Sequence, residues 1–164
     1  MRMLFIALAM GLLAAPLSAA VVDDCDDSSR FFLYPGEKNV AAMSVVEGTV
    51  VMAKTPPGDA FTRWSSAPMA RIPINAEHNK LAIHFGPFTG KTSAHVTLDL
   101  YRGKKRVGSK NLPKVTVGDQ IVEQDLEAIA AEIEGGADGF ALFIRHGGDA
   151  SGTVVFDRIA VTAK

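Results

Sequence analysis

The sequence has 164 residues and few of the features that anchor small domains or mark familiar enzymes. It contains a single cysteine, Cys25, which excludes an internal disulfide and a paired-cysteine metal site. It also lacks the G-x-S-x-G and H-E-x-x-H patterns of common hydrolases, and its four histidines show no local ligand spacing. The sequence therefore predicts no cofactor, and an enzyme is not the favoured interpretation.

Long apolar runs are absent except at the N-terminus. Arg2 precedes the apolar stretch 3–13, and the small-residue stretch 14–20 follows it. This order is typical of a secretory signal peptide, and the apolar part is shorter than the ~20 residues that span a membrane. We therefore expect a signal peptide over residues 1–20 and a periplasmic or secreted mature chain without a transmembrane anchor. Nucleic acid is not an expected partner.

The mature chain begins with an acidic segment, residues 21–29. Four aspartates surround Cys25, and their charges disfavour its thiolate, which argues against a nucleophilic cysteine. We expect a flexible, solvated leader, with contact to a cation or a partner as the alternative.

Charges further along the chain are sorted by sign, although lysines and arginines (17) nearly balance aspartates and glutamates (18). Basic residues cluster within 102–114 and acidic residues within 119–138. A basic run in an exported protein could bind anionic polysaccharide or lipid headgroups. The favoured interpretation is a solvated basic turn beside an acidic neighbour, whose charges mostly cancel.

Most of the chain shows the alternation of apolar and polar residues that is typical of half-buried strands. The pattern is clearest over 81–85 and 94–101, and the turn residues 86–91 between them predict a hairpin. Further strands are expected at 31–34, 49–54, 61–65, 71–74, 105–108, 139–145 and 153–162. Their spacing predicts an all-β fold, an antiparallel β-sandwich forming a single domain over 30–164.

One segment departs from this alternation. Between Asp119 and Glu134 the apolar residues follow helical spacing, and Gly135-Gly136 supplies a stop. We expect one short α-helix around 120–134, capped by Asp119 or Asp125. The alternative is a strand over 120–124 with only the second half helical.

The predicted hairpin places polar side chains on one outward face. These are His84, His95, Thr97, Asp99 and Tyr101, and Arg145 could join them from a later strand. Such a face offers donors, acceptors and a flat ring, as a sugar-binding surface needs. An ordinary solvated sheet is the simpler alternative, and two histidines with a carboxylate could instead bind a divalent metal.

Trp64 is the only tryptophan, and it lies in the predicted strand 61–65. On a polar strand face its ring could stack on a sugar. A lone tryptophan in a domain of this size is more often part of the core.

The last strands carry a resemblance to known families. The segment 152–161, G-T-V-V-F-D-R-I-A-V, with the glycine-rich turn and apolar strand 135–144 before it, resembles the closing strands of jelly-roll carbohydrate-binding modules and galactose-binding-like domains. The match covers about a fifth of the chain. The resemblance implies a jelly-roll fold and a structural role for Asp157.

Fold and resemblance together lead to three hypotheses about function. The first is an exported, non-catalytic module that binds a carbohydrate or cell-envelope glycan, in which Trp64 and Tyr101 stack while His84, His95, Asp99 and Arg145 form hydrogen bonds. The second is a periplasmic accessory or structural protein that binds an envelope protein through a sheet edge or the charged region 102–138. The third is a small polysaccharide-acting enzyme.

Overall fold

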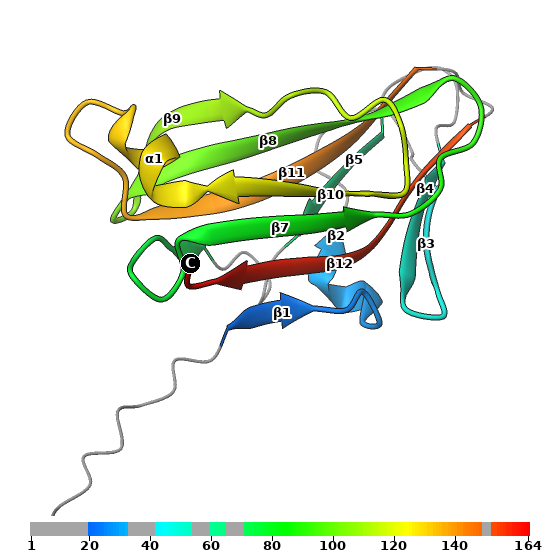
Figure 1. The fold of residues 1–164 in the computed structure, drawn as a ribbon, viewed down its shortest axis with the longest axis horizontal. Helices are drawn as coiled ribbons and strands as arrows, with labels where there is room; N and C mark the ends of the chain where they lie inside the picture. The colour runs from blue at the N-terminus through cyan, green and yellow to red at the C-terminus, as the bar shows by residue number, and fades with distance from the viewer. Residues whose placement is uncertain (1–19, 33–41, 54–59, 65–70, 149–151) are drawn as a thin grey trace, which may run out of the picture.

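The computed structural model describes residues 20–32, 42–53, 60–64, 71–148 and 152–164. The predicted signal peptide lies almost entirely outside these residues and stays a prediction. In the described ranges the protein is an antiparallel β-sandwich with one short α-helix (Figure 1). The all-β prediction is confirmed. None of the helices described is both long and apolar enough to cross a membrane.

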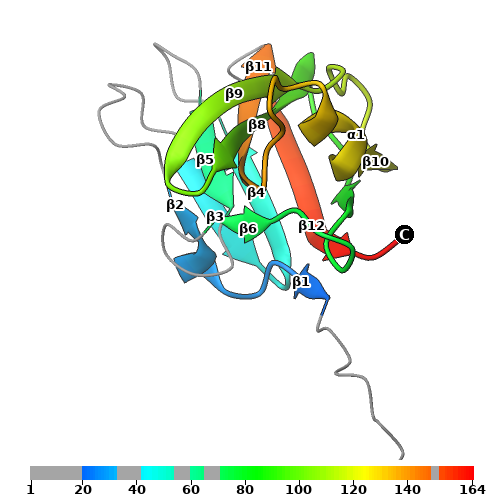
Figure 2. The ribbon, with the colours of Figure 1, turned by 90° about the vertical axis from the view of Figure 1, so that its left-hand side faces the viewer.

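Two sheets form the sandwich, each with six strands in the described part of the chain. Sheet A has the order β10 (Gln120–Asp125), β7 (Lys80–Phe85), β12 (Thr153–Thr162), β4 (Thr49–Ala53) and β3 (Ala42–Val46), and β1 (Val21–Asp23) also pairs with β12. Sheet B has the order β2 (Phe31–Phe32), β5 (Ala60–Trp64), β11 (Gly139–Gly148), β8 (Thr92–Arg102) and β9 (Lys105–Asn111), and β6 (Ile72–Pro73) also pairs with β11. In Figure 2, β10 and β12 of sheet A lie apart from β5, β8 and β9 of sheet B.

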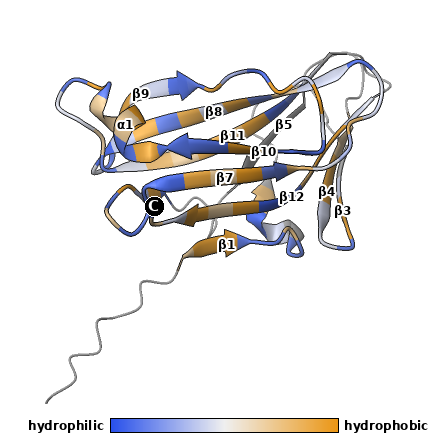
Figure 3. Cartoon of the chain, in the orientation of Figure 1, coloured by the Kyte–Doolittle hydropathy of each residue, from blue (hydrophilic) through white to orange (hydrophobic). Residues whose placement is uncertain are grey.

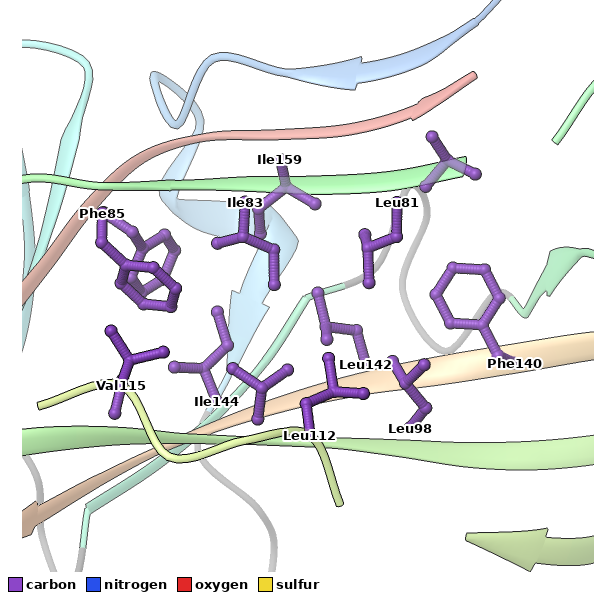
Figure 4. Close-up of a cluster of buried hydrophobic side chains, with 14 of the residues drawn as sticks. Leu81, Ile83, Phe85, Leu98, Leu112, Val115, Phe140, Leu142, Ile144 and Ile159 are labelled. Carbon is purple, nitrogen blue, oxygen red and sulfur yellow. The ribbon is translucent and has the colours of Figure 1, made fainter. Parts of the chain in front are cut away.

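The core fills the space between the two sheets, and alternation along each strand decides which residues enter it. On β7, Leu81, Ile83 and Phe85 are buried, while the residues between them are only half-buried. Figure 3 shows the corresponding mixture of hydrophobic and hydrophilic residues along β7 and β12. Figure 4 shows side chains of β7 facing Leu142 and Ile144 of β11 across the core. Each sheet therefore keeps an outer face away from the core.

The segment 119–134 is the predicted alternative, a strand followed by a short helix. β10 pairs with β7, and α1 (Leu126–Ala131) follows directly. Asp125 caps the helix, because its Oδ1 accepts a hydrogen bond from the Ala128 N–H at 3.0 Å. Gly135 and Gly136 adopt the left-handed conformation, but the helix ends before this predicted stop, at Ala131, with Glu132 as its C-cap.

The predicted hairpin between 81–85 and 94–101 is wrong. Both segments are strands, but β7 belongs to sheet A and β8 to sheet B. Their connection is held by β12, because the Gly86 and Thr89 N–H groups donate to the carbonyls of Val155 and Thr153 at 3.1 Å each. The connection therefore crosses between the sheets and does not close a hairpin.

The expected flexible leader is also corrected. Val21–Asp23 pairs with β12, and Cys25 and Asp23 are buried. The Cys25 N–H donates to Oδ1 of Asp23 at 2.9 Å, and Arg30 lies 3.3 Å from the same carboxylate. In place of the solvated segment there is a short strand, and the Asp23 side chain closes the turn that follows it.

Candidate functional site

The outer face of sheet B collects most of the predicted site residues. Residues at even positions from 94 to 100 on β8 are buried, whereas His95, Thr97, Asp99 and Tyr101 are half-buried. Ser93 lies on the same side of the strand. We call these five residues, Ser93 to Tyr101 at odd positions, the β8 strip. At about 3.3 Å per residue, His95 and Tyr101 lie roughly 20 Å apart along the strand.

His95 and Arg145 meet across the two central strands of sheet B. The register places them opposite each other on β8 and β11, which lie side by side in Figure 1. Nη2 of Arg145 lies 3.3 Å from Nδ1 of His95. A guanidinium only donates, so Nδ1 accepts and the proton of the neutral imidazole is on Nε2. The predicted pairing of Arg145 with this face is therefore present.

Gly147, two residues after Arg145, makes room for the His95 ring. A Cβ atom at this position would lie 2.8 Å from Nε2 of His95 and 2.9 Å from Oγ of Ser93. The Ser93 hydroxyl is buried and has no hydrogen-bond partner among the described residues. The His95 ring, the Ser93 hydroxyl and the backbone of Gly147 are thus tightly packed at this end of the β8 strip. This packing fixes the imidazole that contacts Arg145.

Gly147→Ala should overpack this end of the strip. We expect the free energy of unfolding to fall by about 1–3 kcal/mol, because the added methyl must displace His95 or Ser93. Urea unfolding measures the loss. In a His95→Ala background the ring is gone, so the same substitution should cost clearly less. An equal cost in both backgrounds would show that the His95 ring does not make Gly147 necessary.

The next two residues of the strip are held by β9. The Thr97 hydroxyl donates to Oδ1 of Asn111 at 2.8 Å. Nη2 of Arg106 lies 2.8 Å from Oδ1 of Asp99. These contacts orient the polar groups before any ligand arrives, and pre-orientation lowers the entropy cost of binding.

Tyr101 has a different environment from the predicted bare stacking platform. The guanidinium carbon of Arg71 lies 3.8 Å from the centroid of its ring, and Nη1 of Arg71 donates to the Gly103 carbonyl at 3.0 Å. A cation over an aromatic ring is a favourable contact. One face of the Tyr101 ring is therefore covered by Arg71, and the polar surface at this end of the strip belongs to the guanidinium.

The structure separates His84 from the other predicted site residues. His84 lies on β7, opposite Ile121 of β10 and Arg158 of β12, so it belongs to the outer face of sheet A. Trp64 lies on β5, opposite Leu142 in the register. Its side chain lies outside what the structure describes, so its role remains a prediction.

No set of three or more histidine, cysteine, aspartate or glutamate residues in the described ranges is placed to hold a metal ion. The predicted metal alternative depended on His84 and His95 sharing a face, and they belong to different sheets. A depression of ≈ 460 Å³ lies elsewhere, on sheet A. Its charged side chains pair with one another, with Lys80 2.7 Å from Glu123 and Lys164 2.7 Å from Asp125.

The charged region 102–138 also pairs internally. Lys110 forms an ion pair with Glu132, and Arg102 donates to the carbonyls of Glu134 and Gly136 at 2.6 and 2.8 Å. These contacts fasten β9 and the end of β8 to the segment after α1. The Lys110–Glu132 pair agrees with the interpretation that charges of the basic and acidic runs cancel one another.

Two residues of the site, Arg71 and Arg106, were not predicted. The sequence analysis placed Arg106 in the basic run 102–114 and Arg71 at the start of the expected strand 71–74, and it gave neither residue a role in the site. Alternation along 105–111 could have suggested that Arg106 faces outward. Nothing local in the sequence indicates that Arg71 lies over Tyr101, because β6 reaches this position only through its pairing with β11.

The chain is similar to known proteins in its fold. No family model and no curated protein matches it. Among solved structures it is similar to the family 11 carbohydrate-binding module from Clostridium thermocellum, in complex with a β-1,3-1,4-mixed-linked tetrasaccharide, at a TM-score of 0.54 and 14% identity, over 89% of this chain and 98% of that one. The chain has the jelly-roll fold of carbohydrate-binding modules. The fold that the resemblance implied is therefore confirmed.

Two longer structures contain a similar fold. One is a family two carbohydrate esterase from Cellvibrio japonicus, with a TM-score of 0.51 and 10% identity over 89% of this chain. The other is the Glycosylation Associate Protein (Gap123) complex from Streptococcus agalactiae, with a TM-score of 0.52 and 9% identity over 82% of this chain. This chain spans only 34% and 24% of those two chains.

Proposed function

We propose that this chain is a non-catalytic carbohydrate-binding module of an exported protein, and that its glycan lies along the β8 strip. The observation that carries the proposal is the row of oriented polar groups on one outer face, from His95 with Arg145 to Tyr101 with Arg71. The jelly-roll fold supports it, and so does the signal-peptide pattern of residues 1–20, which is the basis for export.

The β8 strip has the chemistry that sugar hydroxyls need. A hydroxyl both donates and accepts; the strip offers a carboxylate and neutral oxygens, and Arg71, Arg106 and Arg145 bring guanidinium donors to it from neighbouring segments. Outward residues on one strand recur at about 7 Å, so successive sugars can meet successive side chains. Phe143 of β11, opposite Thr97, adds a half-buried ring beside the middle of the strip.

The competing hypotheses have less support. The envelope-partner hypothesis used the charged region 102–138, and several charges of that region are engaged within the chain. The hypothesis of a polysaccharide-acting enzyme needs an acid–base pair in a cleft. The depression on sheet A lies away from the β8 strip, and its lysines and carboxylates neutralise one another.

Glycan binding is tested by affinity electrophoresis and a glycan array with the purified mature chain. We expect binding to at least one glycan class, and a loss of about tenfold in affinity in Phe143→Ala and in Thr97→Ala, equivalent to ~1.4 kcal/mol. His84→Ala, on the other sheet, should bind as the unmodified chain does. Thermal unfolding of each variant verifies that it is folded.

If the chain bound none of the neutral or acidic glycans in these two assays, the proposal would be contradicted. Binding that His84→Ala weakens, while Thr97→Ala and Phe143→Ala leave it intact, would place the ligand on sheet A and contradict the assigned face.

A further inference from the structure

The depression of ≈ 460 Å³ on sheet A has no part in the β8 strip. It lies where the end of β10, the start of β7 and the end of β12 are neighbours (Figure 1). The register places Asp125, Lys80 and Thr162 in one row across these three strands. Adjacent strands lie about 4.8 Å apart, so the row is roughly 10 Å wide. Its volume is within the ~300–1,000 Å³ of small-molecule sites, and its width suits a short ligand.

Asn79, the residue before β7, fixes the backbone around the depression. Its N–H donates to the Thr162 carbonyl at 3.0 Å, and its carbonyl accepts from the Leu126 N–H at 2.9 Å. Its side-chain Oδ1 accepts from the Lys164 N–H at 2.8 Å, and the residue is buried. The ends of β10 and β12 are therefore held against β7 without a ligand, which lowers the entropy cost of binding.

The charged side chains of the lining are paired, and their charges sum to zero. Nζ of Lys80 lies 2.7 Å from Glu123, and Nζ of Lys164 lies 2.7 Å from Asp125. Glu127, outside the lining, lies 3.4 Å from the same Lys164 ammonium. The hydrogen bond from Lys164 lowers the pKa of the Asp125 carboxyl, so this pair stays charged at neutral pH.

These ion pairs leave hydrogen-bonding capacity for a ligand. An ammonium has three donors and a carboxylate about four acceptor sites, and one ion pair uses only part of either. A ligand with a net charge would compete with an existing pair. A neutral ligand with several hydroxyls can instead donate to the carboxylate and accept from the ammonium of the same pair, because a hydroxyl does both.

Two uncharged side chains of the lining add open groups. The Gln124 amide and the Thr162 hydroxyl have no hydrogen-bond partner among the residues that the structure describes, and both residues are half-buried. The amide offers two donors and an acceptor, and the hydroxyl offers one donor and two lone pairs. Ala163 is the only apolar residue of the lining, so the depression does not suit an apolar ligand.

We infer that this depression is a second carbohydrate site, which binds a short neutral saccharide through Gln124, Thr162 and the two ion pairs. The inference goes beyond the proposed function and does not depend on it, because the β8 strip lies on the other sheet. The strip is suited to an extended chain, whereas the depression is suited to a chain end or a free disaccharide.

The test is two-dimensional NMR of the ¹⁵N-labelled mature chain with cellobiose, lactose or maltose, each at about 10 mM, tenfold above a 1 mM Kd. We expect at least one disaccharide to shift the backbone amide signals of Lys80, Gln124 and Ala163. Gln124→Ala should lose about tenfold in affinity for that disaccharide, because it removes open donors and an acceptor without changing charge.

Gln120→Ala is the matched control. Gln120 lies on the same side of β10, roughly 13 Å from Gln124, and its amide donates to the Val117 carbonyl. This variant should keep its affinity for the disaccharide within about twofold. The dispersion of each spectrum verifies that the variant is folded, and equal losses in the two variants would overturn the inference.

The remaining outcomes separate this inference from the proposed function. If none of the three disaccharides shifted signals at the depression, or if shifts were confined to Thr97 and Phe143, the second site would be overturned while the β8 strip could still bind glycan. Tighter binding of glucosamine or glucuronate than of the disaccharides would overturn the assignment to a neutral ligand. Shifts at the depression, with no glycan bound on the strip, would support the second site and contradict the proposed function.

Discussion

The thiol of Cys25 should resist iodoacetamide in the folded protein and react readily once the chain is unfolded. The side chain is fully buried, and alkylation requires the thiolate. Burial raises the pKa of this thiol, and the carboxylates of Asp23, Asp157, Asp24 and Asp26 raise it further. We expect labelling at least about a hundredfold slower than in the unfolded chain, because it must await opening of the segment.

Mass spectrometry of samples labelled with and without guanidinium chloride measures this ratio. The raised pKa also has a consequence for stability, because folding favours the protonated thiol. Its stabilising contribution is complete below the ordinary cysteine pKa and is lost as the pH rises above it. Cys25→Ala should remove that alkaline loss. Rapid labelling of the folded chain would mean that residues 21–30 are open in solution, as the sequence alone had suggested.

The leader shows why composition can mislead. Four aspartates in five residues predict solvation, because isolated carboxylates avoid the interior. Asp23 lies on the same face of β1 as Val21, however, and its buried carboxylate meets Arg30 seven residues later. The left-handed conformation of Cys25, with φ 58°, closes the turn. Nothing local in the sequence indicates the pairing of this segment with β12, far along the chain.

The same distinction holds for the strands. Alternation located β7 and β8 well, since it reports which residues face the core. It says nothing about which neighbour each strand pairs with, and the turn residues at 86–91 serve a connection between sheets as well as a hairpin. His84 was therefore assigned to the wrong face, although its outward orientation was correct.

The sequence predicted which residues of β8 belong to the candidate site. It did not predict which residues of other strands contact them. The outward positions of His95, Asp99 and Tyr101 follow from alternation along one strand. Their lateral partners, Arg106 and above all Arg71, come from strands whose register depends on the whole of sheet B. The polar groups were thus expected, whereas the contacts that orient them emerged only from the assembled sheet.

Asp23→Ala should lower the free energy of unfolding by about 2–4 kcal/mol. The substitution leaves the buried N–H of Cys25 without its 2.9 Å acceptor and removes the carboxylate that Arg30 contacts. Arg30 is partly exposed and can be solvated again, so the loss should stay below that of a fully buried ion pair. Urea unfolding followed by circular dichroism measures the change.

Asp23→Asn separates the two contributions. Its amide oxygen can still accept from the Cys25 N–H, while the charge that Arg30 meets is gone, so the loss should be smaller than in Asp23→Ala. Asp26→Ala is the matched control, because Asp26 is an exposed aspartate of the same segment and should change stability by less than about 0.5 kcal/mol. If Asp23→Ala proved as mild as Asp26→Ala, β1 and its turn would contribute nothing to the sandwich. Cys25 should then be as reactive in the native protein as in the unfolded chain.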